Sequence, residues 1–149
     1  MKKFLTALLI TFIIPCFAFA DEQTEFQDMI RTILETGGEI KNITDTLRPN
    51  TRLYIYKQLP SMKKKIEESE KTIADIKTRA DEVIKNKDLN SIVQDMASIQ
   101  LLTINVTKEL LEVYENTGAI TQKDYNNVVS KYEKDAKQLQ KSLERYKNM

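Results

Sequence analysis

The stretch that decides the fold is residues 59–83, LPSMKKKIEESEKTIADIKTRADEV. Apolar or small residues recur in it at alternating steps of three and four, and charged residues fill most of the positions between them. Such a 3.5-residue repeat predicts an α-helix that packs nearly parallel or antiparallel to its neighbours. The positions of this repeat are Leu59, Met62, Ile66, Ser69, Ile73, Ile76, Ala80 and Val83.

Two further repeats of the same kind follow along the chain. The tripeptide Asn86-Lys87-Asp88 separates the first two, with Asp88 predicted as an N-cap, and Gly118 ends the second. Because short connections favour antiparallel neighbours, we predict an all-α protein in which residues 59–149 form an antiparallel three-helix bundle with heptad packing. The second repeat is Ile92, Met96, Ile99, Thr103, Val106, Leu110 and Val113, and the third is Tyr125, Val129, Tyr132, Ala136, Leu139, Leu143 and Tyr146.

The start of the last helix has the clearest boundary. We predict that Thr121 caps it, that Asp124 three residues later completes a capping box, and that Ile120 and Tyr125 form a hydrophobic staple around the cap. Pro60 is tolerated in the first turn of the helix over residues 59–83, because its missing N–H would have no partner there.

Residues 21–58 depart from this regularity. Apolar residues from Phe26 to Leu34 predict a short amphipathic helix that Gly37-Gly38 ends, with a turn or two more helix before Pro49. Residues 53–59 alternate tyrosine and isoleucine, yet no other segment would supply a partner strand. We therefore expect a short N-terminal helix and an irregular or helical appendage, in one domain with residues 59–149.

Residues 1–20 have the pattern of a secretory signal peptide. Two lysines precede an apolar run over residues 4–17, and Ala18-Phe19-Ala20 supplies small residues at the −3 and −1 positions of a cleavage site. The run is short for a membrane span and contains Pro15. We expect cleavage after Ala20, export, and membrane contact only through the signal peptide. Acylation of Cys16 is the alternative, although Pro15 is a poor fit before a lipidated cysteine.

Composition narrows the functional classes. Loss of Lys2 and Lys3 lowers the basic residues from 23 to 21 against 22 acidic ones, so residues 21–149 carry a net charge of −1. That balance argues against nucleic acid as a partner. Residues 21–149 contain no Cys and no His, and the chain has no glycine-rich phosphate loop. We therefore predict no enzyme activity, no cofactor, no metal and no small-molecule substrate.

Protein partners remain, and one segment is a candidate for binding them. Tyrosine gives a large contact area at a small entropic cost and is enriched at interfaces. The candidate residues are Leu53, Tyr54 and Tyr56, which lie outside the regular heptads, and Leu59, which begins the first one; the segment could equally cap one end of the bundle. Leu101, Ile104 and Leu111 form a second apolar stripe, which we attribute to contacts with more than one helix; any exposed remainder would be an oligomerisation face.

An exported, Cys-free helical bundle with a short N-terminal helix and an appendage resembles the TraC-type minor pilus subunits of type IV secretion systems. It is also similar to the small helical antigens of some host-associated bacterial systems. Gln/Lys-rich heptads, such as Ile99-Gln100-Leu101-Leu102 and Gln138-Leu139-Gln140-Lys141, carry the likeness. The resemblance implies a bacterial protein of the periplasm or the pilus surface, with pilus or envelope proteins as partners and a role in assembly or adhesion to target cells. A periplasmic helical chaperone, or an inhibitor or exclusion factor, is the alternative.

Overall fold

The computed structural model of the protein describes residues 20–49 and 55–146. Over these two ranges the chain forms four α-helices and one short 3-10 turn, and it forms no strand, so the all-α prediction is confirmed. None of the four is both long and apolar enough to cross a membrane. The predicted signal peptide lies almost wholly outside the described residues. In chain order the elements are α1 (Ala20–Thr46), η1 (Ile55–Lys57), α2 (Leu59–Val83), α3 (Lys87–Thr117) and α4 (Gln122–Tyr146).

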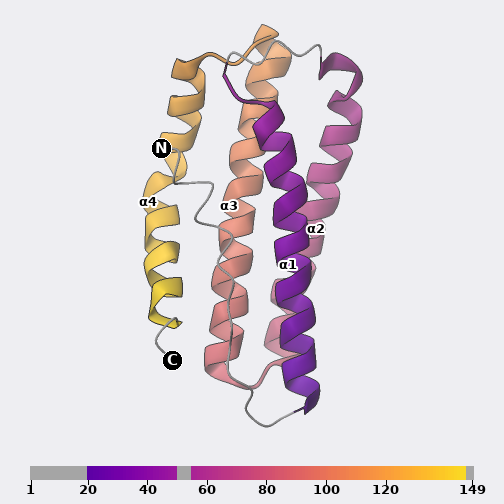
Figure 1. Ribbon diagram of the computed structural model, residues 1–149, viewed down its shortest axis with the longest axis vertical. Helices are drawn as coiled ribbons and strands as arrows, with labels where there is room; N and C mark the ends of the chain where they lie inside the picture. The colour runs from indigo at the N-terminus through magenta and orange to yellow at the C-terminus, as the bar shows by residue number, and fades with distance from the viewer. Residues whose placement is uncertain (1–19, 50–54, 147–149) are drawn as a thin grey trace.

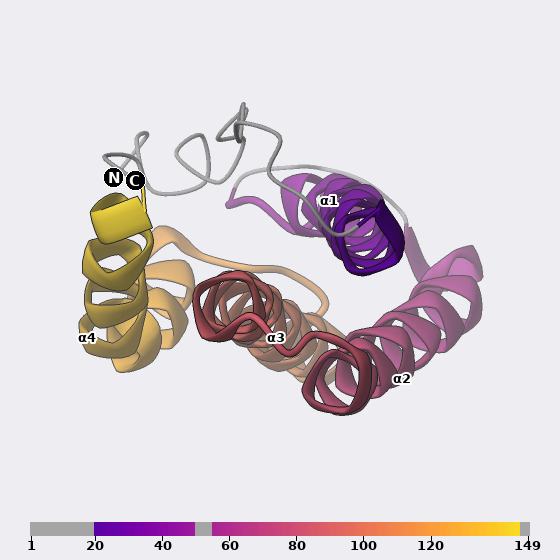
Figure 2. The ribbon, with the colours of Figure 1, turned by 90° about the horizontal axis from the view of Figure 1, so that it is seen from below.

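The four helices lie side by side and alternate in direction along the chain (Figure 1). Seen along their axes, α1, α2 and α3 form a triangle, and α4 lies outside it, next to α3 (Figure 2). Helix α3 is the centre of this arrangement because it packs against each of the other three. Helices α1 and α2 also pack against each other, whereas α4, over the described residues, packs along its length against α3 alone.

This layout corrects the predicted bundle of residues 59–149. Helices α2 and α4 occupy different sides of α3 and do not pack against each other in the described part of the chain. The third place in the bundle belongs to α1, because α3 has a second buried face beyond its predicted heptad positions. Thr107 and Gln100, on that face, contact α1. The buried residues of this second face are Val93, Ala97, Gln100, Ile104, Thr107, Leu111 and Tyr114.

Helix α1 is also longer than predicted, because it continues through Gly37-Gly38 to Thr46. Gly37 lies where α1 crosses α3: a Cβ added there would stand 2.5 Å from the side-chain Nε2 of Gln100, so the glycine permits close approach of the two helices. Beyond the crossing, the Thr44 and Thr107 hydroxyls share a buried hydrogen bond of 2.7 Å. Gly37 thus serves packing, where the sequence had indicated a stop, while Gly38 has open space around it.

Of the four helix ends predicted after residue 58, three agree with the structure. Pro60 lies in the first turn of α2, and Gly118 follows α3 in the left-handed conformation with φ of 74°. The Thr121 hydroxyl accepts from the Asp124 N–H at 3.1 Å while the Asp124 carboxylate accepts from Thr121, as the capping box requires. The fourth prediction is wrong, since the cap of α3 is Asn86, whose side chain accepts from the N–H groups of residues 88 and 89.

Candidate functional site

The end of the bundle where α3 ends and α2 and α4 begin carries the predicted binding segment (Figure 1). Residues 55–57 form η1 there, and the Gln58 N–H donates to the Ile55 carbonyl at 2.7 Å, which leads the chain into α2. The segment is thus helical in its described part, as expected. Leu53 and Tyr54 lie outside the described residues. Ile55 is buried, Leu59 is half-buried and Tyr56 is exposed.

Tyr56 is the most exposed large apolar side chain among the described residues, with 54% of its surface accessible. Its ring lies against Tyr114 of α3, with 5.4 Å between the ring centroids and a tilt of 47°. Its hydroxyl lies over Gly118, where an added Cβ would stand 2.8 Å from the oxygen. Tyr56 therefore presents one face of a positioned aromatic ring to solvent, which is the geometry of a contact residue.

Sequence reasoning did not find Tyr114, the partner that positions Tyr56. The two residues are far apart in the chain, and Tyr114 lies on the second buried face of α3, which the heptad series omits. A salt bridge of 2.7 Å between Lys63 and Glu115 joins α2, the helix that follows η1, to α3 near this end. The aromatic pair is thus held on a braced part of the bundle.

A second tyrosine, Tyr125, lies at the start of α4 and is half-buried. Burial raises the pKa of its hydroxyl, and the nearby Arg48 opposes this rise more than Asp45 reinforces it. The electrostatic influence of Asp45 and Arg48 places the end of α1 close to the first turn of α4. This end of the molecule therefore gathers residues from every helix.

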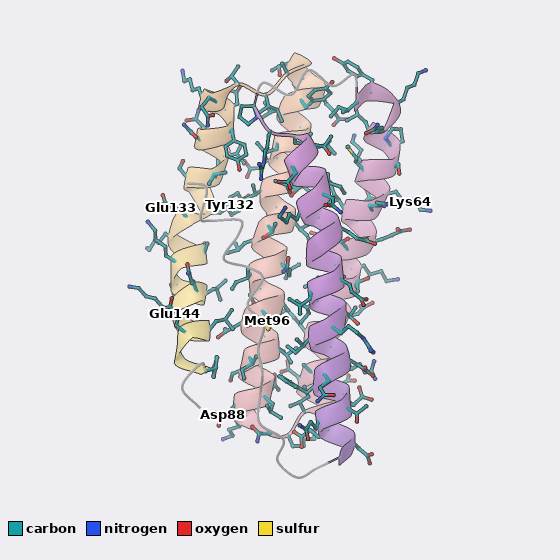
Figure 3. The ribbon with its side chains drawn as sticks, in the orientation of Figure 1. Lys64, Asp88, Met96, Tyr132, Glu133 and Glu144 are labelled. Atoms are coloured by element: carbon teal, nitrogen blue, oxygen red, sulfur yellow. The ribbon has the colours of Figure 1, made fainter. Side chains whose placement is uncertain are left out.

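The most perturbed titratable groups lie between α3 and α4. The Tyr132 hydroxyl and the Lys131 ammonium both donate to the Glu109 carboxylate, and Figure 3 shows Tyr132 on the side of α4 that faces α3. The bond to Glu109, reinforced by burial, raises the pKa of Tyr132 to about 12. Burial alone would raise the pKa of Glu109, but the bonds from Lys131 and Tyr132 outweigh it and the pKa is lowered.

These shifts suit a structural contact better than catalysis. A general acid or base works best with a pKa near the operating pH, and both groups titrate further from neutrality than they would in water. A second polar contact between the same helices runs from the Ser142 hydroxyl to the Asp95 carboxylate. Among the described residues, no group of three or more acidic, His or Cys side chains could hold a metal ion. The polar contacts between α3 and α4 therefore serve to join the two helices.

Comparison with known proteins gives no relative from which a role could be transferred. No family model, no curated protein and no solved structure matches this chain.

Proposed function

We propose that this chain is an exported helical protein that binds other proteins through the η1 end of its bundle, as a subunit associated with the pilus of a type IV secretion system. The signal-peptide pattern of residues 1–20 supports export. The resemblance to TraC-type subunits supports the pilus or envelope as the place of action. In this proposal the protein catalyses nothing and its partners are other pilus or envelope subunits.

The observation that carries the binding role is the exposed, positioned ring of Tyr56. Tyrosine is enriched at protein interfaces, and rigid tyrosines bind with little loss of conformational entropy. Tyr56 is held by Tyr114 before any partner arrives, so part of the ordering is complete in the free protein. A single aromatic anchor of this kind can contribute about 2 kcal/mol or more to binding.

The chain supplies a matched control for testing this role. Val83 is the other exposed large apolar residue of the described chain, with 37% of its surface accessible, and it lies at the far end of α2 from η1. Tyr56→Ser and Val83→Ser each remove an exposed apolar side chain without opening the core. Their effects on folding should therefore be similarly small, within about 1 kcal/mol.

The experiment is a pull-down from envelope fractions of the native bacterium, with captured proteins identified by mass spectrometry and each variant's melting temperature measured in parallel. The wild-type protein and Val83→Ser should capture pilus or secretion-channel subunits, and Tyr56→Ser should lose them while staying folded. An unchanged set of partners with Tyr56→Ser would remove this end of the bundle as the site. Capture of no secretion or pilus subunit by the wild-type protein would overturn the proposed place of action.

Export has its own test. The protein recovered from the envelope or medium should begin at Asp21 by mass spectrometry and carry no lipid. A protein that begins at an acylated Cys16 would show that the export route is that of a lipoprotein.

A further inference from the structure

The outer helices of the molecule differ in charge. Helix α1 contains seven acidic and two basic residues, whereas α4 contains four acidic and six basic ones. Helix α2, which lies between them in the chain, has six of each. The whole sequence has a net charge of only +1, so copies of the protein do not repel one another strongly. The charge is thus separated within a nearly neutral molecule.

The acidic residues of α1 form a row on its outer face. Asp21, Asp28, Glu35 and Glu39 follow at steps of seven, seven and four, which places them on one side of a helix, and all four are exposed. Gly37, whose α-carbon faces α3, lies on the opposite side of α1. Asp28 pairs with Arg31 of the next turn, while the other three acids form no ion pair with any described residue. We call this row the acidic face.

The basic residues of α4 form a row of equal length. Lys123, Lys134, Lys137 and Lys141 share one side of the helix by their spacing, and all four are exposed. Lys137 pairs with Glu133, and the other three lysines make no ion pair within the described part of the chain. We call this row the basic face. The buried residues of α4, Val128 and Leu143, lie on the other side of the helix, toward α3.

The two rows match in length and cannot meet within one molecule. In each row the first and last members are eighteen residue steps apart, which is about 27 Å at 1.5 Å per residue. Helices α1 and α4 lie on different flanks of α3 (Figure 2). By its spacing each charged row lies on the side of its helix away from the residues that face α3. Glu133 and Glu144 lie on the side of α4 away from α3 (Figure 3), so the positive row has acidic neighbours.

We propose that the basic face of one copy binds the acidic face of a second copy. The occupant of the basic face is thus α1 of another molecule of the same protein. Helix α4 runs antiparallel to α1 within one copy (Figure 1), so a copy translated sideways brings α4 antiparallel to α1 of its neighbour, which also opposes their helix dipoles favourably. Because the contact joins two different faces, each added copy leaves one of each free, and the assembly is an open chain.

The charged contact sets the expected strength and salt dependence. Exposed ion pairs contribute little individually, so the association is weak, and complementary rows mainly fix register and orientation. Salt should abolish it, since the Debye length falls from about 30 Å at 0.01 M to about 3 Å at 1 M. The purified protein should therefore grow in average mass with concentration at low salt and stay monomeric at high salt.

Charge reversal tests the proposal. In the antiparallel contact Lys141 and Lys134 lie opposite Asp21 and Asp28 of the neighbouring copy. One variant therefore carries Lys134→Glu and Lys141→Glu on the basic face, and another carries Asp21→Lys and Asp28→Lys on the acidic face. Each variant alone neutralises one row and places like charges opposite each other at the two changed positions, so it should remain monomeric in sedimentation velocity at low salt. A mixture of the two variants restores opposite faces between unlike copies, and its average mass should return to at least the wild-type value.

A matched pair of variants on α2 controls for net charge. Lys65→Glu with Lys71→Glu, and Glu67→Lys with Asp75→Lys, change the net charge by the same amounts at exposed residues. Circular dichroism melts check that all four variants fold.

Every outcome of these sedimentation experiments either supports or overturns the proposal. Association that persists in the α4 or α1 variants alone, association lost equally in the α2 variants, or a wild-type protein that is monomeric at low salt at every concentration would overturn the proposal. Loss only in the α1 and α4 variants, with rescue only in their mixture, would establish it. The outcome is independent of the Tyr56 pull-down, since none of these substitutions touches the η1 end.

Discussion

Helices α2 and α4 both pack against α3 and both carry an unbroken heptad series, yet they differ in burial. In α2 the six heptad positions from Met62 to Ala80 are all buried. In α4 only Leu143 of the seven is buried, and the other six are partly exposed. The difference follows from the number of partners, because α2 has two helices to pack against and α4 has one. A heptad pattern thus predicts a packing seam but not how many helices share it.

The largest expected effect on stability comes from placing a charge at a heptad position of each helix. Ile73 of α2 is fully buried and Leu139 of α4 is partly exposed. Ile73→Asp places a carboxylate in the core and should cost about 4 kcal/mol or more, a large share of the 5–15 kcal/mol typical of a domain. Leu139→Asp should cost about 1 kcal/mol, because its carboxylate can reach water. Urea denaturation followed by circular dichroism measures both, and equal losses would show that α4 is as deeply packed as α2.

The two glycines of α1 give a smaller test, in which neighbouring substitutions should change the stability in opposite directions. Gly37→Ala removes a flexible residue from a helix but pushes a methyl group into the buried Gln100 amide, so it should destabilise by about 1 kcal/mol. Gly38→Ala meets nothing within 4 Å and should stabilise by about the same amount through helix propensity. Thermal unfolding of the two variants should shift in opposite directions. A stabilising Gly37→Ala would mean that α1 does not press closely on α3.

The glycine pair also shows what the sequence could not predict. The helix ends at Pro60, at Gly118 and at the Thr121–Asp124 capping box were predicted correctly, because each depends only on neighbouring residues. Gly37-Gly38 resembles such an end, but the glycine is required by Gln100, a residue of another helix. The distinction between a stop and a close crossing is tertiary, so a local pattern cannot make it.

The candidate site has the same mixed outcome. The heptads left residues 53–58 outside the seam, and within the described part of this segment Tyr56 is exposed whereas Ile55 is buried. The ring that positions it, Tyr114, lies on a face of α3 that is buried only because α1 completes the triangle. Likewise the Glu109–Tyr132 contact joins two helices whose relative rotation no single helix specifies. Pairings between distant elements are therefore what the sequence left undetermined.

The stability of the contact between α3 and α4 should depend on pH, because two groups with shifted pKa values lie in it. The pKa of Tyr132 is raised from 10.0 to about 12 in the folded protein, so its contribution to stability is complete below pH about 10 and is lost as the pH rises toward 12. The pKa of Glu109 is lowered, so its contribution is complete above its ordinary pKa of 4.5 and is lost as the pH falls below that value.

Tyr132→Phe keeps the ring and removes the hydroxyl, so it isolates the alkaline effect. It should lower the stability by about 1 kcal/mol at neutral pH, the usual value of one hydrogen bond. It should also abolish the loss of stability that ionisation of Tyr132 causes at alkaline pH. Amide hydrogen exchange resolved by helix can measure this, because α4 has one partner and should open before α2 does. Val129→Ala, on the same helix, is the control for general weakening, since it loosens α4 without changing its pH profile. If α4 and α2 lose protection together as the pH rises, the two helices belong to one cooperative unit despite their different burial.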